Sequence, residues 1–532
     1  MLEAQRSSDW TTAAALLAAV LFLLLSWSPY HYWDEFFYLF SAAAHTPREL
    51  IRFEPTQTLF PNGFFTGKIG HVVLLRLLLD ALGPGRTSLI IIQSLYALMV
   101  VAFSAAGWGL LRELLDRRSA DTAALVLLFL PVTTYLGYKT LSEVPSMLFI
   151  ALGCWSFLRS YREPIRIRVT LLLALSVLCL ALGTLCRFTS MLTFVGLVAG
   201  MILSRHRRLS ARGVIRAVVV LVASLLLYLV VLYGLGGSVS QLAGIAYHTA
   251  SRQGVGMERI YALALTVQGL IILLPFAVWR RRDEPMFRMA AIWLAFTAVP
   301  ALMVFEPRYY APALIPLAML GAFGLRNFTR SVFRTERSLV PVTCLALLVL
   351  IDHAVFSPLM PYEIDQNRLM TAMEQLQQAA PDGSFLVPWI SDWAFIRIVF
   401  PRTRALLCIS AAPTSRYTAE GRSGIMPAAD RWWSGPRYYV GSRAALSQEP
   451  GPWYYIGWTF SPPLMRLRDL LQSLGIHWAD NPGRVGGHDH MTGSWVWTDR
   501  GLSLRQIEQD GQYHVFQVLS GHNRSARPEP GA

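Results

Sequence analysis

Charged residues are scarce in this sequence. They make up 15% of the 532 residues, whereas hydrophobic residues make up 54%. A soluble globular protein carries about 25% charged residues, so the shortage excludes an ordinary soluble protein. Apolar runs close to the ~20 residues that cross a bilayer recur along the chain. We therefore predict a polytopic α-helical membrane protein.

Cysteine and lysine are also rare. The five cysteines show no Cys-x-x-Cys spacing and no disulfide framework. Most of them lie in apolar stretches, where a buried thiol behaves as a small hydrophobe. Among the 47 basic residues only Lys68 and Lys139 are lysines, which we interpret as composition rather than function.

The positive charge that is present belongs to the predicted membrane part. The formal net charge is +14, yet residues 358–532 carry 16 arginines against 15 acidic residues. No domain-sized basic face remains to bind a phosphate backbone, so we expect no nucleic-acid partner. Arginines instead concentrate in alternate loops between the predicted helices, as the positive-inside rule requires. This pattern predicts a cytoplasmic N-terminus and an outer C-terminal region.

The apolar runs predict about eleven transmembrane helices. The first is interpreted as an uncleaved anchor because it lacks a small-x-small cleavage site. The helices are expected at residues 11–29, 87–111, 121–137, 143–158, 169–186, 189–204, 217–235, 260–279, 289–304, 309–325 and 338–357.

The transmembrane domain is expected over residues 1–357. A long loop lies within this domain, and a second domain follows it. The outer loop 30–86 contains an apolar stretch, Ile69–Leu82, whose charges suit an interfacial helix better than a span. Residues 358–520 alternate helix-like with β-like stretches and predict an extracytoplasmic α/β domain. The helix-like stretches are Glu363–Ala380 and Leu464–Leu474, and the β-like ones are Ser384–Pro388, Ala405–Ile409, Tyr454–Thr459 and Tyr513–Val518. Residues 521–532 predict a flexible tail.

Ionisable residues stand at the outer ends of several predicted helices. Asp34 and Glu35 follow the first helix and Glu143 opens the fourth. Arg187 separates the fifth from the sixth, and Arg308 precedes the tenth. An ionisable group at membrane depth costs ~2.5–3.5 kcal/mol on insertion scales. Carboxylates and guanidinium groups on one face could together serve an anionic ligand and an acid–base step, so we expect a polar pocket there.

Each of these residues also has a simpler interpretation. Asp34 and Glu35 could be solvated residues beside an interfacial aromatic belt. Glu143 could simply favour the dipole of its helix. Arg187 and Arg308 could extend to lipid headgroups. Their location on one face weakens these interpretations when they are taken together.

Three short motifs resemble those of the GT-C superfamily of membrane glycosyltransferases, of the protein O-mannosyltransferase and aminoarabinose-transferase type. The Trp33–Tyr38 stretch is similar to the Asp-Glu motif of the first outer loop in that family. Thr140–Ser146 is similar to the Ser-Glu segment that opens a middle helix. Pro307–Pro312 is similar to the Arg-Tyr-x-x-Pro segment before a late helix. The likeness covers most of residues 1–330.

The resemblance implies a sugar donor linked to a polyprenyl phosphate and an inverting single displacement at the outer side of the membrane. It implies that Asp34 is the general base and that Glu35 supports it or binds a metal. Glu143 would support the site, and Lys68 and His71 would contact donor or acceptor. The donor phosphate would be bound by Arg308, Arg187, Lys139 and Tyr309.

Metal dependence varies within the superfamily, so a divalent metal stays open and no cofactor is assigned. His488-Asp489-His490 lacks an identifiable third ligand, and a solvated loop is favoured there. Glu306, close to Arg308, could neutralise that arginine by pairing with it.

Two other functions stay open. A transporter or flippase of a lipid-linked or amphiphilic solute would place charges near the midplane and show related halves, and the sequence shows neither. An assembly protein could bind a partner through the aromatic-rich segments 432–439 and 453–458, although core strands and turns are favoured for most of these residues. If the protein is a transferase, we expect a glycan, a lipid or a protein as the acceptor. We expect the protein to lie in a bacterial inner membrane, in contact with membrane lipids.

Overall fold

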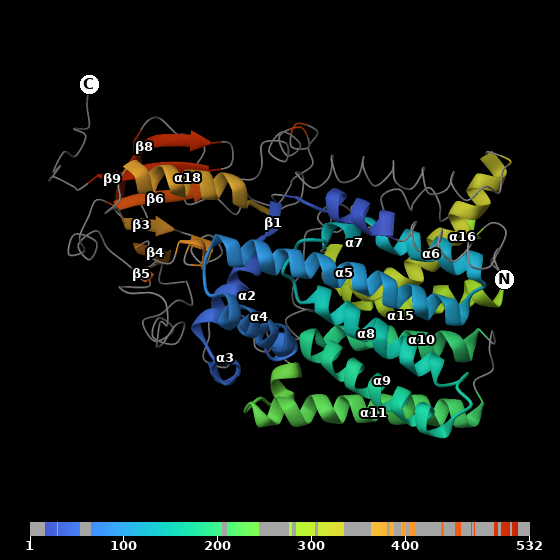
Figure 1. The fold of residues 1–532 in the computed structure, drawn as a ribbon. Helices are drawn as coiled ribbons and strands as arrows, with labels where there is room; N and C mark the ends of the chain where they lie inside the picture. The colour runs from blue at the N-terminus through green and yellow to red at the C-terminus, as the bar shows by residue number, and fades with distance from the viewer. Residues whose placement is uncertain are drawn as a thin grey trace.

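The computed structural model contains a bundle of long helices with a β-sheet beyond one end (Figure 1). The described residues are 16–28, 30–53, 65–204, 210–243, 276–278, 284–303, 307–332, 334, 363–379, 384–387, 395–396, 398–400, 404–409, 438–440, 453–458, 470, 473, 494–497, 502–510 and 513–519.

Several bundle helices are long and apolar enough to cross a membrane: Arg86–Leu114, Arg166–Cys186, Ala211–Gly234 and Arg308–Val332. This supports an integral membrane location, while the number of about eleven spans stays a prediction. The predicted helices at 260–279 and 338–357 lie wholly or largely outside the described residues. The bundle helices are α5 (Arg86–Leu114), α6 (Arg117–Leu128), α7 (Pro131–Tyr135), α8 (Glu143–Arg159), α9 (Arg166–Cys186), α10 (Leu192–Leu203), α11 (Ala211–Gly234), α15 (Pro285–Met303) and α16 (Leu314–Val332).

Two predicted spans are broken. The expected helix 121–137 is instead α6 followed by the short α7, because Pro131 cannot donate the backbone hydrogen bond that would continue α6 and instead begins α7. The expected helix 189–204 begins as a 3-10 turn, η3 (Phe188–Met191), before α10. Both breaks were missed because the apolar pattern continues through them.

The described parts of residues 30–86, the predicted outer loop, fold into short helices at one end of the bundle. They are α2 (Trp33–Ala44), α3 (Pro47–Phe53), η2 (Thr66–Lys68) and α4 (Ile69–Leu82). The helix α4 has the bounds expected from the sequence, whereas α2 was not anticipated. The apolar side chains Phe36, Leu39 and Phe40 are at most 1% exposed, so α2 is fixed in the core. Asp34 and Glu35 therefore lie in the first turn of a buried helix rather than in a solvated loop.

The next described segments after α16 are a strand and a helix, and the strand pairs with the segment before α2. The strand β1 (Tyr30–Tyr32) pairs antiparallel with β2 (Glu363–Asp365), and His31 is opposite Ile364. The helix α18 (Gln366–Ala379) follows β2. A helix had been expected from Glu363, but residues 363–365 pair with β1 and the helix starts three residues later.

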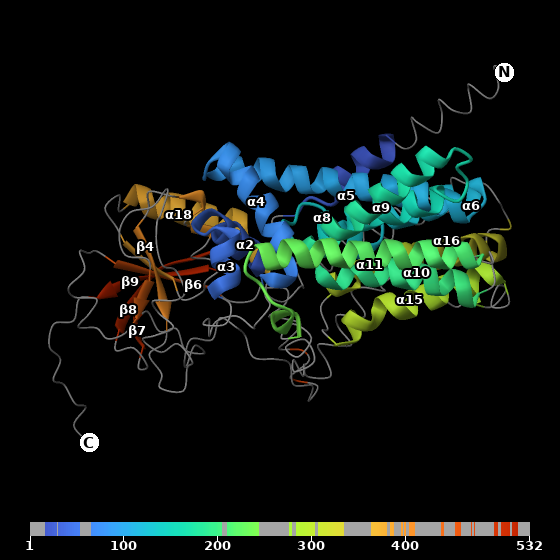
Figure 2. The same cartoon turned by 90° about the horizontal axis from the view of Figure 1, so that it is seen from below.

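A seven-stranded mixed sheet follows, in the order β5-β4-β3-β6-β9-β8-β7. The pairs among β5, β4, β3 and β6 are parallel and the others are antiparallel. Figure 2 shows the sheet, α2 and α3 at the same end of the bundle. The domain boundaries at 358 and 520 stay predictions. The strands are β3 (Ser384–Val387), β4 (Arg404–Ile409), β5 (Tyr438–Val440), β6 (Trp453–Trp458), β7 (Ser494–Trp497), β8 (Leu502–Asp510) and β9 (Tyr513–Leu519).

Candidate active site

Four charged side chains from separate elements meet in what we call the four-charge cluster: Asp34, Glu143, Arg187 and Arg308. Nη1 of Arg308 lies 2.9 Å from Oδ2 of Asp34, and its Nε lies 3.8 Å from Oε1 of Glu143. Nη1 of Arg187 lies 2.7 Å from the same Oε1. The carboxylate of Glu143 is therefore shared by two guanidinium groups, one of which also pairs with Asp34.

Helix ends hold these side chains in place. Asp34 is in the first turn of α2 and Glu143 is the first residue of α8, where the helix dipole favours a carboxylate. Arg187 caps α9, and Arg308 lies in the 3-10 helix η4 (Pro307–Ala313). A Cβ on Gly183 would lie 2.7 Å from Cγ1 of Ile150, so the glycine permits the close packing of α8 on α9.

The members of the cluster differ in accessibility. The side chain of Asp34 is 14% exposed, whereas those of Arg308 and Glu143 are 3% and 0% exposed. Asp34 is thus the member that a substrate reaches most easily, and the others form its buried support.

Tyr309 and Ser142 complete the surroundings of the arginines. The ring centroid of Tyr309 lies 4.5 Å from Cζ of Arg187 and 5.5 Å from Cζ of Arg308. Ser142 Oγ accepts from Nη1 of Arg187 at 3.2 Å and donates to Oε2 of Glu143 at 3.0 Å. The aromatic face and the hydroxyl both stabilise the guanidinium groups in their present orientation.

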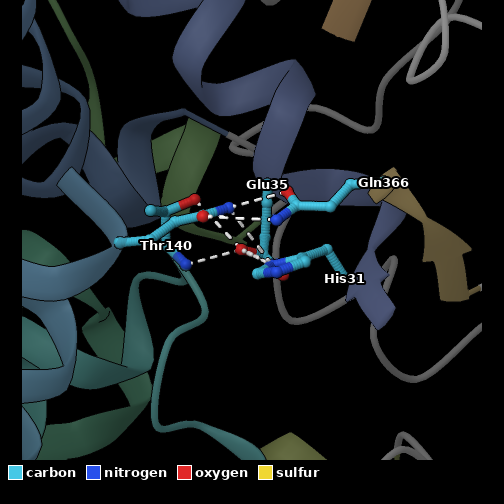
Figure 3. Close-up of polar contacts among 5 residues, drawn as sticks. His31, Glu35, Thr140 and Gln366 are labelled. Carbon is cyan, nitrogen blue, oxygen red and sulfur yellow. Dashed lines mark hydrogen bonds and ion pairs between the residues drawn. The ribbon is translucent and has the colours of Figure 1, made fainter. Parts of the chain in front are cut away.

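Glu35, the neighbour of Asp34, faces a different set of partners. Its Oε2 accepts from the backbone N–H and Oγ1 of Thr140 at 2.6 and 3.1 Å and lies 3.2 Å from Nδ1 of His31. Figure 3 shows Glu35, His31, Thr140 and Gln366 converging from different segments. Burial raises the pKa of Glu35, but His31, Lys139 and the Thr140 amide outweigh it, and the net effect lowers this pKa.

Lys139 lies on the Glu35 side of the site. Its charge acts on Glu35, and its Nζ lies 4.3 Å from the ring centroid of Tyr135. The residue is 3% exposed. A role for Lys139 in binding the donor phosphate stays a prediction.

Lys68 and His71 lie beside Tyr38 of α2. Nζ of Lys68 donates to the hydroxyl of Tyr38, and His71 packs edge-on against the Tyr38 ring. Burial lowers the pKa of Lys68 to about 7, with Asp34 opposing this shift and Arg308 adding to it. Burial lowers the pKa of His71 to about 3, so His71 is a neutral ring that accepts or donates one hydrogen bond with Tyr96.

Comparison with known proteins tests the resemblance seen in the motifs. Residues 71–233 match the family described as dolichyl-phosphate-mannose-protein mannosyltransferase. ArnT from Cupriavidus metallidurans bound to undecaprenyl phosphate has a similar fold, with 13% identity, a TM-score of 0.51 and coverage of 96% of this chain and 98% of that chain. The resemblance to GT-C membrane glycosyltransferases is confirmed. No curated protein sequence matches the chain.

Another GT-C structure is also similar. The archaeal oligosaccharyltransferase AglB from Archaeoglobus fulgidus, in complex with an inhibitory peptide and a dolichol-phosphate, has 12% identity and a TM-score of 0.45. The match covers 74% of this chain and 64% of that chain. The family match at 71–233 includes α8 and α9 and therefore contains Glu143 and Arg187 of the four-charge cluster.

Among the described residues no group of three or more histidine, cysteine, aspartate or glutamate side chains could hold a metal ion. His488-Asp489-His490 and Glu306 lie outside the described residues. The sequence predicted the carboxylates and arginines of the four-charge cluster on one face, and the structure adds that Arg308 pairs with Asp34 and Glu143.

Sequence reasoning missed several polar residues of this site. His31, Gln93 and Gln366 were not singled out, and neither was Tyr38 for its contact with Lys68. The signal for His31 was its spacing of four residues from Glu35, which places both side chains on one face when the segment turns into a helix. Gln93 and Gln366 carried no local signal, because they meet only in the folded chain.

Proposed function

We propose that this GT-C protein transfers a sugar from a polyprenyl-phosphate-linked donor to an acceptor hydroxyl at the outer face of the membrane. The observation that carries the proposal is the 2.9 Å contact between Asp34 and Arg308, which combines an accessible carboxylate with a buried cation. The family match to a dolichyl-phosphate-mannose-dependent transferase supports the donor class. The similar fold of ArnT, which binds undecaprenyl phosphate, also supports it.

Asp34 is the proposed general base. Its side chain is 14% exposed, more than those of Glu143 and Arg308, and a base must come within hydrogen-bond distance of the proton it accepts. When the acceptor oxygen attacks the anomeric carbon, its proton passes to Asp34. The bond from that carbon to the phosphate oxygen breaks at the same time, and its electron pair leaves with the phosphate. One displacement of this kind inverts the anomeric configuration.

Arg308 and Arg187 are the proposed ligands of the donor phosphate. The two guanidinium groups of the cluster are already paired with its two carboxylates. An incoming phosphate therefore competes with Asp34 for Arg308. Binding of the donor would thereby release Asp34 for the acceptor, while Glu143 keeps both arginines in position. Preorganised positive charge stabilises the departing phosphate in the transition state. Tyr309 would support the arginines, and Lys68 would add a further cation.

The orientation that this proposal requires follows from the loop charges. In the proposed orientation the arginine-rich loops lie in the cytoplasm and the four-charge cluster lies on the outer side. Residues 358–520 are then an extracytoplasmic domain. A bacterial inner membrane with a cytoplasmic N-terminus satisfies these conditions. A divalent metal could assist the leaving phosphate, but the described residues provide no cluster for one.

The test is sugar transfer by the full-length protein in lipid nanodiscs. Undecaprenyl-phosphate-linked mannose and aminoarabinose are supplied as radiolabelled donors, with cell-envelope extract as the acceptor source. We expect Asp34→Asn to lower transfer about 10²–10⁴-fold, because general-base catalysis contributes that much. Thermal unfolding of the variant confirms that it is folded.

Asp80→Asn is the matched control. Asp80 is a partly exposed residue of α4 that pairs with Arg76, so the same chemical change there leaves transfer unchanged. Undiminished transfer by Asp34→Asn would refute Asp34 as the base. Movement of the lipid-linked donor across vesicle membranes without any glycosyl product would instead favour the transporter or flippase.

A further inference from the structure

A buried amide pair connects α18 with the bundle. Nε2 of Gln93, on α5, donates to Oε1 of Gln366 at 3.0 Å, and Nε2 of Gln366 donates to Oε1 of Gln93 at 3.4 Å. Gln93 and Gln366 are 5% and 6% exposed. Gln366 is the first residue of α18 and directly follows β2, which pairs with β1. The start of α18 is thus fixed both by a backbone ladder and by a two-way side-chain contact.

The amide pair packs against His31, which in turn donates to Glu35. Nδ1 of His31 lies 3.2 Å from Oε2 of Glu35 and 3.5 Å from Nε2 of Gln93. A carboxylate can only accept, so the shorter contact requires that Nδ1 of His31 carries the proton and donates it to Glu35. Gln93 donates to Gln366, and its Nε2 packs against His31 at 3.5 Å without a hydrogen bond, because both nitrogens are then donors. His31 has 1% of its surface exposed and Glu35 has none.

Glu35 joins the two chain segments that carry the carboxylates of the four-charge cluster. It adjoins Asp34 in the first turn of α2, and it accepts from the backbone N–H and the hydroxyl of Thr140. Thr140 lies three residues before Glu143, at the entry to α8. A single carboxylate oxygen therefore fixes the α2 segment that presents Asp34 against the segment that presents Glu143.

We propose that Glu35 is a positioning residue and that Gln366 of α18 acts through it, by way of Gln93 and His31, to hold Asp34 in place. The proposal rests on the proposed function of Asp34 as the base. It makes β2 and α18, which follow the last predicted span, a part of the scaffold of the active site. The sheet is connected to this scaffold because α18 packs on β9.

The first test measures amide hydrogen exchange in the full-length protein by mass spectrometry. The amide of Thr140 donates directly to Glu35, so its exchange reports on the contact independently of sugar transfer. In Gln366→Ala we expect exchange of peptides covering 30–38 and Thr140 to accelerate about tenfold, as expected when one hydrogen bond is lost. Unchanged exchange in both peptides would overturn the proposal, even in a protein whose sugar transfer has not been detected.

A matched control lies on the same helix. Glu374 pairs at 2.9 Å with Arg86 through exposed side chains, so Glu374→Gln removes another α18–α5 contact without touching the network. Exchange at Thr140 should stay at the wild-type rate in this variant. Equal acceleration in Glu374→Gln and Gln366→Ala would overturn the proposal, because general loosening of α18 would then be the cause.

The second test separates positioning from stability. A variant with both Gln93→Leu and Gln366→Leu removes the connection without leaving a buried amide unpaired, so it is expected to fold. We expect kcat to fall about tenfold, with the donor KM changed less than about threefold, because Asp34 is misplaced while the phosphate ligands stay. Wild-type kcat in this double variant would refute the role of Gln366. Loss of transfer in Asp34→Asn is scored separately, so the two proposals fail on different measurements.

Discussion

Asp34 and Glu35 are adjacent in sequence, yet they belong to two different polar regions. Asp34 faces Arg308 in the four-charge cluster, where the contacts are ion pairs and the side chain keeps 14% exposure. Glu35 faces His31 and Thr140, where the contacts are hydrogen bonds and no surface is exposed. The first region can exchange a partner for a substrate, whereas the second is closed.

This difference shows how one turn of a helix can provide both a reactive group, Asp34, and the residue that positions it, Glu35. Successive residues of a helix point about 100° apart, so neighbouring carboxylates need not share an environment. The charged region requires matched cations, because a buried charge without its partner costs about 3–5 kcal/mol. The closed region requires donors of fixed geometry. Variants that alter one region and spare the other can test this division.

The largest effect on stability is expected from Arg308→Gln, which also lowers catalysis. This change leaves Asp34 and Glu143 with one cation fewer, and breaking a buried pair costs about 3–5 kcal/mol of stability. Loss of a preorganised charge at the leaving phosphate should lower kcat about 10²–10³-fold. Thermal unfolding and donor kinetics measure the two effects.

The control for Arg308→Gln is Arg86→Gln. Arg86 forms an exposed ion pair with Glu374, and such pairs contribute at most about 1 kcal/mol. Its unfolding temperature should therefore stay close to the wild-type value. Similar losses in the two variants would show that the cluster is no more important than a surface contact.

A smaller effect on catalysis is expected from Glu35→Gln. The amide keeps one oxygen for Thr140 but loses the charge, and hydrogen bonds to a charged group contribute about 1.5–3 kcal/mol. Transfer should fall about tenfold, as for a misplaced base, and not disappear. If Glu35→Gln abolishes transfer as completely as Asp34→Asn in a folded protein, Glu35 is catalytic and the division is wrong.

The same variant has a pH signature. Because the pKa of Glu35 is lowered in the folded protein, its ionised form contributes stability above the unfolded pKa of about 4.3. That contribution is lost as the pH falls through the lower folded value. The difference in unfolding temperature between wild type and Glu35→Gln should be largest near neutral pH and shrink in acid.

The sequence predicted the charged region better than the closed one. Asp34, Glu143, Arg187 and Arg308 stood out because a charge at the end of an apolar helix is expensive and therefore conspicuous. Their pairing could not be predicted, since Asp34 and Arg308 are far apart in the chain. The residues of the closed region carry no charge pattern or motif that distinguishes them in the sequence. Only the folded chain brings together His31, Gln93 and Gln366.

The fold was predictable to a similar extent. The apolar pattern predicted α4 with its observed bounds and most of the bundle helices to within a few residues. It missed α2, because the aromatic stretch after the first span resembled an interfacial belt. It also missed the break at Pro131, since the hydrophobic run continues on both sides of this residue. Periodicity reports which faces are apolar, and it does not report where a buried helix begins.

The smallest effect is expected from Lys68, which lies beside the charged region. Burial lowers the pKa of Lys68 to about 7, so the amine loses its proton as the pH rises through about 7. A bound donor phosphate favours the protonated form and raises this pKa. Donor binding is then tightest below pH 7, and the donor KM increases above it by no more than about tenfold per pH unit.

Lys68→Met tests this explanation. The variant has no titrating amine at this position, so its donor KM should be higher than that of the wild type at pH 6 and should not change with pH between 6 and 9. Titration of His71 does not contribute in this range, because its pKa is lowered to about 3. A pH dependence that persists in Lys68→Met would assign the proton to another group. The phosphate would then be held by the four-charge cluster without help from Lys68.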